Sequence, residues 1–263
     1  MPFIVYSKSN QTSKNIADAL MKELDFGAVG EINGLQHLKS DLAEMLVLDG
    51  SILDANFLDS YLDTDVIIFP CSHRSAKGIP SFTVHAEGNW SREAKLGGEP
   101  KNLSTAAPDW MLCALKHLLK NNSTGLPVLY EATHHGPLLK TPSLFIEVGG
   151  TEQAMLDKGY AAIVAKSIAG MLDSEKDFDS CIFGAGSLHY PEKFTQAALS
   201  RGYAFSHIMP KYYASETDMI KEGIEKTSIE VDKAVIEWKG IGAADRNKII
   251  EKLNLLGIDY ERI

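Results

Sequence analysis

Short apolar runs alternate with helical patterns along the 263 residues of the chain. Phe3–Ser7 predicts a strand buried on both faces, and apolar residues at helical spacing predict a helix over 9–25. In 81–87 apolar and polar residues alternate, which predicts a strand with two unlike faces. Further strands are expected over 65–70, 128–133, 144–148, 181–184, 203–208, 235–238 and 258–262, and further helices over 107–120, 152–173, 191–200 and 243–256. This alternation is typical of an α/β protein with a central, mostly parallel or mixed sheet flanked by helices.

The organisation of the chain favours a single domain over 1–263. No internal repeat and no low-complexity linker divides the sequence. The segment 88–104 is rich in glycine, asparagine, lysine and arginine, and a loop of this length in a compact domain is usually functional or mobile. We therefore predict a lid or excursion at 88–104.

Composition narrows the class of protein. A hydrophobic content of 44% and a charged content of 23% are ordinary for a folded protein. No apolar run approaches the ~20 residues of a membrane helix, and the first residues lack the features of a secretory signal. The three cysteines are scattered and form no C-x-x-C pair, which fits a reducing compartment. We therefore expect a cytoplasmic protein that does not bind membranes.

Histidine is the most informative residue type in this sequence. His37 and His117 lie in ordinary helical or loop contexts, whereas the other six of the eight histidines lie in or beside predicted strands and turns. These six are His73, His85, His134, His135, His189 and His207. Because ligands of open α/β sheets bind beyond the carboxyl ends of strands, polar clusters at such ends are candidate parts of one site.

Two of these clusters directly follow predicted strands. Ser72, His73 and Arg74 would hold a phosphate or polarise a carbonyl, and the alternative is an ordinary polar turn. His134 and His135 should point to opposite faces of a regular strand. The glycine and proline that follow them end the strand, and this break would bring both imidazoles to one rim. The alternative is one core histidine and one surface histidine.

Two further clusters stand between a predicted strand and a predicted helix. Glu147 is a carboxylate among apolar residues, which is costly to bury unless it is paired or bound to a metal. Gly149 and Gly150 would let backbone N–H groups approach an anion at the start of the helix, or would only form a turn that needs positive φ. The G-x-G that contains Gly186, ahead of His189, lacks the third glycine of a dinucleotide fingerprint.

Four such clusters in one chain indicate a single site assembled from distant loops, rich in imidazole and with carboxylates nearby. A site of this kind suits metal-assisted or general-base hydrolysis. No P-loop, H-E-x-x-H or G-x-S-x-G motif is present, which counts against the reaction classes that use them. No local ligand spacing defines a zinc site, so the residues alone leave the metal open.

At the same clusters the sequence resembles the archaeal and plant-type D-aminoacyl-tRNA deacylases. The most specific elements are T-H-H-G-P, which contains His134 and His135, and H-Y-P, which begins at His189. The resemblance follows the family's order from residue 7 to about residue 213. The matching stretches are 7–10, 72–74, 82–89, 131–137, 142–152 and 184–191.

The resemblance implies a hydrolase that cleaves the ester of D-aminoacyl-tRNA and releases the D-amino acid and tRNA. It also implies an architecture related to peptidyl-tRNA hydrolases and nucleoside phosphorylases, with zinc as cofactor and the tRNA 3′ end as partner. The net charge of −9 counts against broad coating of nucleic acid, but a small patch that binds a few nucleotides is compatible with it. No protein partner is inferred, and we expect a monomer.

Site residues carried over from the resemblance fall into three groups. The catalytic candidates are His85, His134, His135, Glu147 and His189, and the candidate zinc ligands are His85, His134, His135 and His189. Candidates for substrate binding are Ser7, Asn10, Ser72, His73, Arg74, Asn89, Gly136, Gly149, Gly150, Thr151, Gly186, Tyr190 and Lys193. In this hypothesis His134 or His135 activates the attacking water, and Arg74 or the N–H groups of 149–151 stabilise the oxyanion. Lys8, Lys14, Lys193 and Lys211 would meet the tRNA end, or are simply solvated surface charges.

Two other classes of protein remain open at this point. One is a zinc-dependent hydrolase or nucleoside phosphorylase-like enzyme that acts on a small metabolite. The other is a noncatalytic module that binds tRNA ends or nucleotides. The number of imidazoles expected in the loops favours an enzyme over a binding module.

Overall fold

The computed structural model of the chain describes residues 1–74 and 78–263, and its larger sheet is mixed. The strands of this sheet are β1 (Phe3–Ser7), β2 (Gly27–Ile32), β3 (Leu35–Lys39), β4 (Glu44–Leu48), β5 (Ile67–Arg74), β6 (Ser81–His85), β9 (Val128–Tyr130) and β10 (Ser143–Gly150). Their order is β2-β3-β4-β1-β5-β10-β6-β9. Strands β4, β1, β5 and β10 run parallel, whereas β6 is antiparallel to β10 and parallel to β9.

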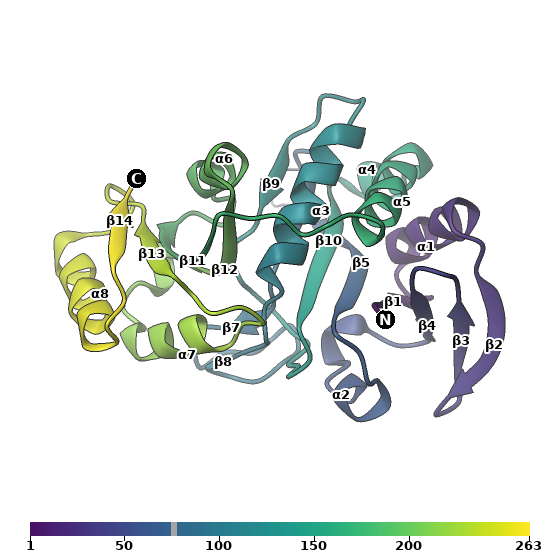
Figure 1. Cartoon of the computed structure of the whole chain (residues 1–263), viewed down its shortest axis with the longest axis horizontal. Coiled ribbons are helices and arrows are strands. Elements are labelled where there is room, and N and C mark those ends of the chain that lie inside the picture. The colour runs from purple at the N-terminus through teal and green to yellow at the C-terminus, as the bar shows by residue number, and fades with distance from the viewer. Residues whose placement is uncertain (75–77) are drawn as a thin grey trace.

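A smaller, parallel sheet lies toward the C-terminal end of the molecule (Figure 1). It consists of β11 (Ser180–Ser187), β12 (Tyr203–Pro210), β13 (Lys233–Ile236) and β14 (Tyr260–Arg262) in the order β12-β11-β13-β14. A short antiparallel ribbon, β7 (Gly88–Asn89) with β8 (Asn102–Leu103), pairs the two ends of the segment 88–104 that was predicted to be an excursion.

Helices cover both faces of the larger sheet. On one face α1 (Gln11–Glu23), α3 (Pro108–Asn121) and α5 (Lys158–Leu172) share a large apolar core with the strands. On the other face a 3₁₀ turn, η1 (Ile52–Asp54), and the short α2 (Leu58–Tyr61) cover a second apolar cluster. The sheet flanked by helices confirms the predicted α/β class.

The short α4 (Glu152–Met155) follows β10 and contacts β10, β5 and α5 of the larger sheet. The remaining helices pack around the smaller sheet and the segments beside it. They are α6 (Glu192–Arg201), α7 (Ile220–Glu225) and α8 (Ala243–Leu255), with 3₁₀ turns η2 (Lys211–Tyr213) and η3 (Thr217–Met219). Helix α3 contacts β12 as well as β6, and therefore joins the two sheets. In Figure 1 it lies between the β2–β3 hairpin at one end of the molecule and α8 at the other.

Several expectations need correction. The helix predicted over 152–173 is two helices, because the Asp157 side chain accepts from two backbone N–H groups and starts α5 afresh. Strand β6 is buried on both faces, so its alternating sequence does not mark a solvent side. The strand predicted over 128–133 ends at Tyr130. Strands β2, β3 and β4 were not predicted, and β2 has no buried apolar face that periodicity would reveal.

The expectations about the cysteines and about membrane helices can be compared with the structure. Cys71, Cys113 and Cys181 are all free thiols in buried positions, as the scattered cysteines predicted. In 1–74 and 78–263, no helix is both long enough and apolar enough to span a bilayer.

Candidate active site

A cavity of about 590 Å³ lies beyond the carboxyl ends of β1 and β5. Ser7 at the end of β1 and Ser72 to Arg74 at the end of β5 line one side. Four residues that the sequence analysis singled out line the other parts of the cavity, and they are His134, His135, Glu147 and His189. The position agrees with the general placement of ligands at the carboxyl ends of parallel strands.

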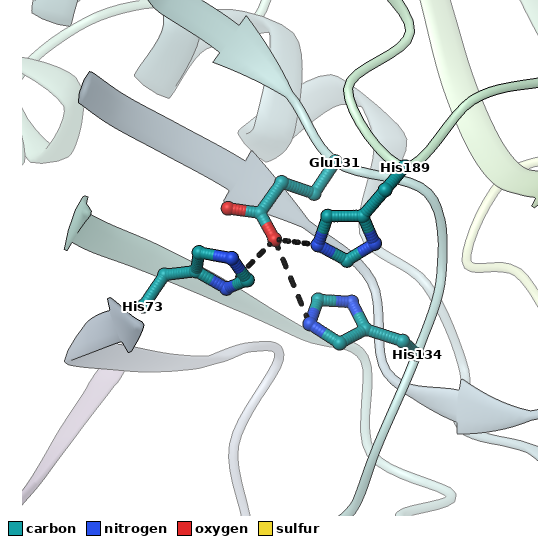
Figure 2. Close-up of side chains that lie close together, drawn as sticks. All are labelled: His73, Glu131, His134 and His189. Atoms are coloured by element: carbon teal, nitrogen blue, oxygen red, sulfur yellow. Dashed lines mark ion pairs between the residues drawn. The ribbon is translucent and has the colours of Figure 1, made fainter. Parts of the chain in front are cut away.

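Glu131 is the centre of this site. Its buried Oε2 lies 3.0 Å from His189 Nε2, 3.1 Å from His73 Nδ1 and 3.6 Å from His134 Nε2. Figure 2 shows the three imidazoles directed toward this oxygen. Burial by itself would raise the pKa of the Glu131 carboxyl, but the surrounding imidazoles lower it to about 2. Glu131 is therefore a carboxylate that three imidazoles from distant segments approach at one oxygen atom.

The chain segment 131–135 crosses from the larger sheet to the smaller one, and this crossing brings the imidazoles together. The Ala132 N–H donates to His189 O at 2.8 Å, and the Thr133 N–H donates to Ile208 O at 3.0 Å. These bonds place the loop that carries His189 beside Glu131. In these residues they take the place of the backbone hydrogen bonds within the larger sheet, which is why β9 ends at Tyr130.

His134 and His135 meet at one rim, as the sequence analysis predicted. Their ring centroids are 4.3 Å apart in an edge-to-face arrangement, and His135 has a φ of +46°. This left-handed backbone conformation interrupts the alternation of side chains that a regular strand would impose. The alternative of one core and one surface histidine is therefore wrong.

Backbone carbonyls fix the protonation of three imidazoles. Nδ1 lies 3.1 Å from Ala86 O in His85, 2.9 Å from Ala132 O in His134 and 2.6 Å from Gly136 O in His135. Because a carbonyl only accepts hydrogen bonds, Nδ1 carries a proton in each ring. In His134 and His135, Nε2 is then left as the nitrogen that can act as a ligand, whereas His85 Nε2 faces Glu147.

The pKa values of neighbouring groups are shifted in opposite directions. Burial, together with the positive charge of nearby imidazoles, lowers the pKa of His134 and brings that of His135 to about 3. Burial also lowers the pKa of His85, but Glu147, with Oε2 at 3.5 Å from His85 Nε2, raises it to about 9. Groups with such divergent pKa values are concentrated at functional sites.

Two buried carboxylates near the site had no assigned role in the sequence analysis. Glu131 directly follows the apolar run 128–130, the same signal that singled out Glu147, whereas Glu87 ends the alternating segment 81–87. Burial raises the pKa of Glu87 to about 8, and Ser143 Oγ lies 3.3 Å from its Oε2. The signal was therefore present at Glu131 as well as at Glu147, but only the fold shows which of them lies among the imidazoles.

The residues present fit a metal ion such as zinc. Ligand atoms of His73, Glu131, His134 and His189 lie within 4.8 Å of one another, and the same holds for the set His85, His134 and His135 and for the set His85, Glu131 and Glu147. Imidazole nitrogens with a carboxylate oxygen are typical zinc ligands. Within the described ranges, both oxygens of Glu131 are buried without a well-directed hydrogen bond. A cation would satisfy them.

Several predicted substrate-binding residues lie at the cavity or beside it. Asn10 Nδ2 donates to Ser72 Oγ at 3.0 Å on the cavity wall, so these two side chains are held as a pair. The Tyr190 ring lies 5.8 Å from the His73 ring. Asn89 Nδ2 donates to Gly97 O at 2.9 Å, which ties the two ends of the turn between these residues.

Other predicted residues are engaged elsewhere. Gly149 and Gly150 belong to β10 and pack against Ser81 and Pro80, so they do not lead an anion-binding helix as expected. Thr151 caps α4, which has only four residues. Gly186 lies inside β11, and Lys193 pairs with Glu237 at 3.1 Å.

The candidate tRNA-contacting lysines differ in their surroundings. Lys8 pairs with Asp49 at 3.2 Å and Lys14 with Asp18 at 2.6 Å. Lys211 is exposed at the start of η2, directly after β12. Exposed ion pairs contribute little to stability, so a phosphate can replace the carboxylate partner at small cost.

Comparison with known proteins shows which family this chain resembles. A model of the D-aminoacyl-tRNA deacylases matches residues 60–261 of the chain. The chain belongs to the D-aminoacyl-tRNA deacylase family. It is 32% identical over 269 residues to the D-aminoacyl-tRNA deacylase of Pyrococcus furiosus, with 99% of each chain covered. It is also 32% identical over 273 residues to that of Methanocaldococcus jannaschii, covering 99% of this chain and 98% of the relative.

A solved structure shows the same fold over the whole chain. The crystal structure of a conserved protein of unknown function superimposes with a TM-score of 0.90 at 26% sequence identity, covering 100% of this chain and 95% of the other. The family match confirms the resemblance that the motifs around His134 and His189 indicated.

Gly136 offers a first test of the geometry of this deacylase-family site. A Cβ atom at Gly136 would lie 2.2 Å from Gly98 N and 2.5 Å from Leu53 O, so the backbone would have to move. We expect Gly136→Ala to displace the neighbouring His135 and to lower deacylation of D-tyrosyl-tRNA at least ~10-fold, since small misplacements of reacting groups have large effects. Gly27→Ala is the control, because a Cβ at Gly27 meets no atom within 4 Å. Equal rates for both variants would contradict this account.

Proposed function

We propose that this chain hydrolyses the ester between a D-amino acid and the terminal ribose of tRNA, with the reacting ester bound beside Glu131. The observation that carries the proposal is the group of imidazoles around one buried carboxylate, at the wall of a cavity of about 590 Å³. A cavity of this size is within the range of small-molecule sites and accommodates a nucleoside with its ester. Family membership supports the choice of substrate.

The terminal nucleoside is assigned to the polar side of this cavity. Ser7, Asn10 and Ser72 offer hydroxyl and amide groups that suit the hydroxyls of a ribose. Arg74 is exposed at the end of β5 and lines the same cavity, where a guanidinium would bind a phosphate. These groups position the ester and carry none of the bond-breaking chemistry.

Glu147 is assigned as the proton acceptor. It lines the cavity, and its Oε2, which has no well-directed hydrogen bond within the described residues, lies 3.8 Å from His73 Nδ1 and 3.5 Å from His85 Nε2. In the proposed reaction water attacks the ester carbonyl, Glu147 takes the proton of that water, and the proton then passes to the ribose oxygen as the ester bond breaks. The lowered pKa values of His134 and His135 make these imidazoles poor bases and favour them as ligands.

Zinc is the cofactor that we propose for this site. His73, Glu131, His134 and His189 would hold one ion, and His85, His134 and His135 provide a second, overlapping set. A bound zinc ion polarises an ester carbonyl and lowers the pKa of a bound water. Glu131 would balance the charge of the ion within a buried site.

The test compares release of tyrosine from D-tyrosyl-tRNA and L-tyrosyl-tRNA, with and without a chelator. We expect rapid release from the D substrate, little from the L substrate, and loss of activity after chelation that added zinc restores. Release that resists chelation and shows no zinc in the protein would contradict the metal assignment. No release from either substrate would contradict the proposed function and favour a hydrolase of small metabolites.

A further inference from the structure

A second, smaller cavity adjoins the proposed ester site. Its volume is about 170 Å³, and it shares Leu96, His134 and His135 with the larger cavity. Its other walls come from β7 and the residues after it, and from Tyr213 in η2. A substrate bound at the two imidazoles therefore has two neighbouring spaces of very different size.

The two cavities differ in volume and therefore in the part of the substrate that each can accommodate. A protein cavity of ~150 Å³ is enough to bind benzene, whereas sites for larger small molecules start at ~300 Å³. The smaller cavity therefore accommodates one amino-acid side chain but not a nucleoside. The larger one, at about 590 Å³, is the one that accommodates a nucleoside.

Trp90 and Tyr213 give the smaller cavity aromatic walls beside the two imidazoles, and the exposed Glu93 and Lys95 also line it. Trp90 is buried, and its Nε1 donates to Thr133 O at 2.9 Å. The rings of Phe183 and His207 pack against the indole, with centroids 6.4 Å and 6.2 Å away. Aromatic walls in a fixed position suit a flat or branched apolar side chain better than a charged one.

We propose that the smaller cavity receives the side chain of the D-amino acid and thereby sets both substrate size and chirality. The inference rests on the proposed function, because it takes the ester to lie at His134 and His135. The nucleoside lies in the larger cavity and the ester carbonyl lies at His134 and His135. These two contacts fix where the three other substituents on the Cα of the amino acid must lie. In the L enantiomer the side chain exchanges places with the amino group or the hydrogen on Cα, so it no longer points into the smaller cavity. The protein therefore selects the D enantiomer by steric exclusion of the L enantiomer.

The deciding experiment fills the smaller cavity from an exposed position. Glu93 lines it, is exposed, and its side chain forms a 2.8 Å surface ion pair with Lys95, so Glu93→Trp should fold normally. We expect this variant to lower the ratio of kcat/KM for D-tyrosyl-tRNA to that for D-alanyl-tRNA by ~10–200-fold, the range for steric discrimination in a pocket. The small methyl group of D-alanine leaves room for the new indole.

A matched variant fills the larger cavity instead. Ser9 is exposed and lines only the larger of the two cavities, so Ser9→Trp should lower kcat/KM for both substrates by the same factor, since both carry the same nucleoside. Conversely, Tyr213→Ala enlarges the smaller cavity and should raise the rate for D-tryptophanyl-tRNA relative to D-tyrosyl-tRNA.

The outcomes separate the two proposals. If Glu93→Trp changes both substrates equally, or neither, while the wild-type protein hydrolyses both, the cavity assignment is overturned and the proposed function stands. If the wild-type protein hydrolyses neither, the proposed function fails, and this inference fails with it. Circular dichroism of each variant excludes misfolding as the cause of a lost rate.

Discussion

Replacing His134 by alanine is expected to lower kcat/KM for D-tyrosyl-tRNA by about 10³-fold or more. His134 belongs to two of the three groups of side chains that are close enough to share a metal ion. Its Nε2 also lies 3.6 Å from Glu131 Oε2, so the variant removes a proposed ligand and one neighbour of the central carboxylate. The loss of a group that takes part in proton transfer or metal binding is typically worth ~10²–10⁴ in rate.

The control for this variant is His37→Ala. His37 pairs with Glu44 at 2.7 Å on β3 of the larger sheet, and it lines none of the cavities described above. We expect wild-type turnover in His37→Ala and a reduced zinc content only in His134→Ala, measured by atomic emission after gel filtration. Wild-type turnover in His134→Ala, with a normal thermal transition, would overturn the assignment of this site.

Glu131→Gln is expected to lower turnover by about 100-fold and to weaken zinc binding by a similar factor. The substitution keeps the size of the side chain but replaces the carboxylate that three imidazoles approach with a neutral amide. A neutral group no longer balances a buried cation, and loss of a group that supports a metal site typically costs ~10–100-fold in affinity or activity. Isothermal titration with zinc and single-turnover kinetics measure the two effects separately.

Glu44→Gln is the matched control for Glu131→Gln. Glu44 is also paired with an imidazole, but it lies on β4, pairs with His37 and Lys39, and lines neither of the two cavities. It should bind zinc and turn over substrate as the wild-type protein does. If Glu131→Gln behaves in the same way, then Glu131 has no part in the site and the proposed ligand set is wrong.

Local sequence patterns predicted most of the elements. The Phe3–Ser7 strand and the helix after it were expected because a buried strand and a one-sided helix leave clear periodicities. α3 was expected because an apolar stripe follows Pro108 near the start of the helix. The Gly27–Ile32 strand was missed because it is largely exposed and pairs through its backbone, which leaves no mark on the side-chain pattern.

The candidate site was predicted only in part. The sequence identified the imidazoles and Glu147 as an unusual set, and the motifs around His134 and His189 indicated the family. Gly149 and Gly150 were assigned to a helix start but belong to β10. The strand was expected to end at its last β-branched residue, Val148, and it continues for two more residues.

The sequence by itself determined the class of fold and the identity of the chemical groups, because apolar periodicity and residue type are local properties. Only the tertiary structure decided that Glu131 is the centre. His73 precedes Glu131 by 58 residues and His189 follows it by 58, yet both contact it. The order of the strands and the crossing of 131–135 between the two sheets bring them together. Those contacts depend on which sheet edges face one another, and no local pattern specifies that.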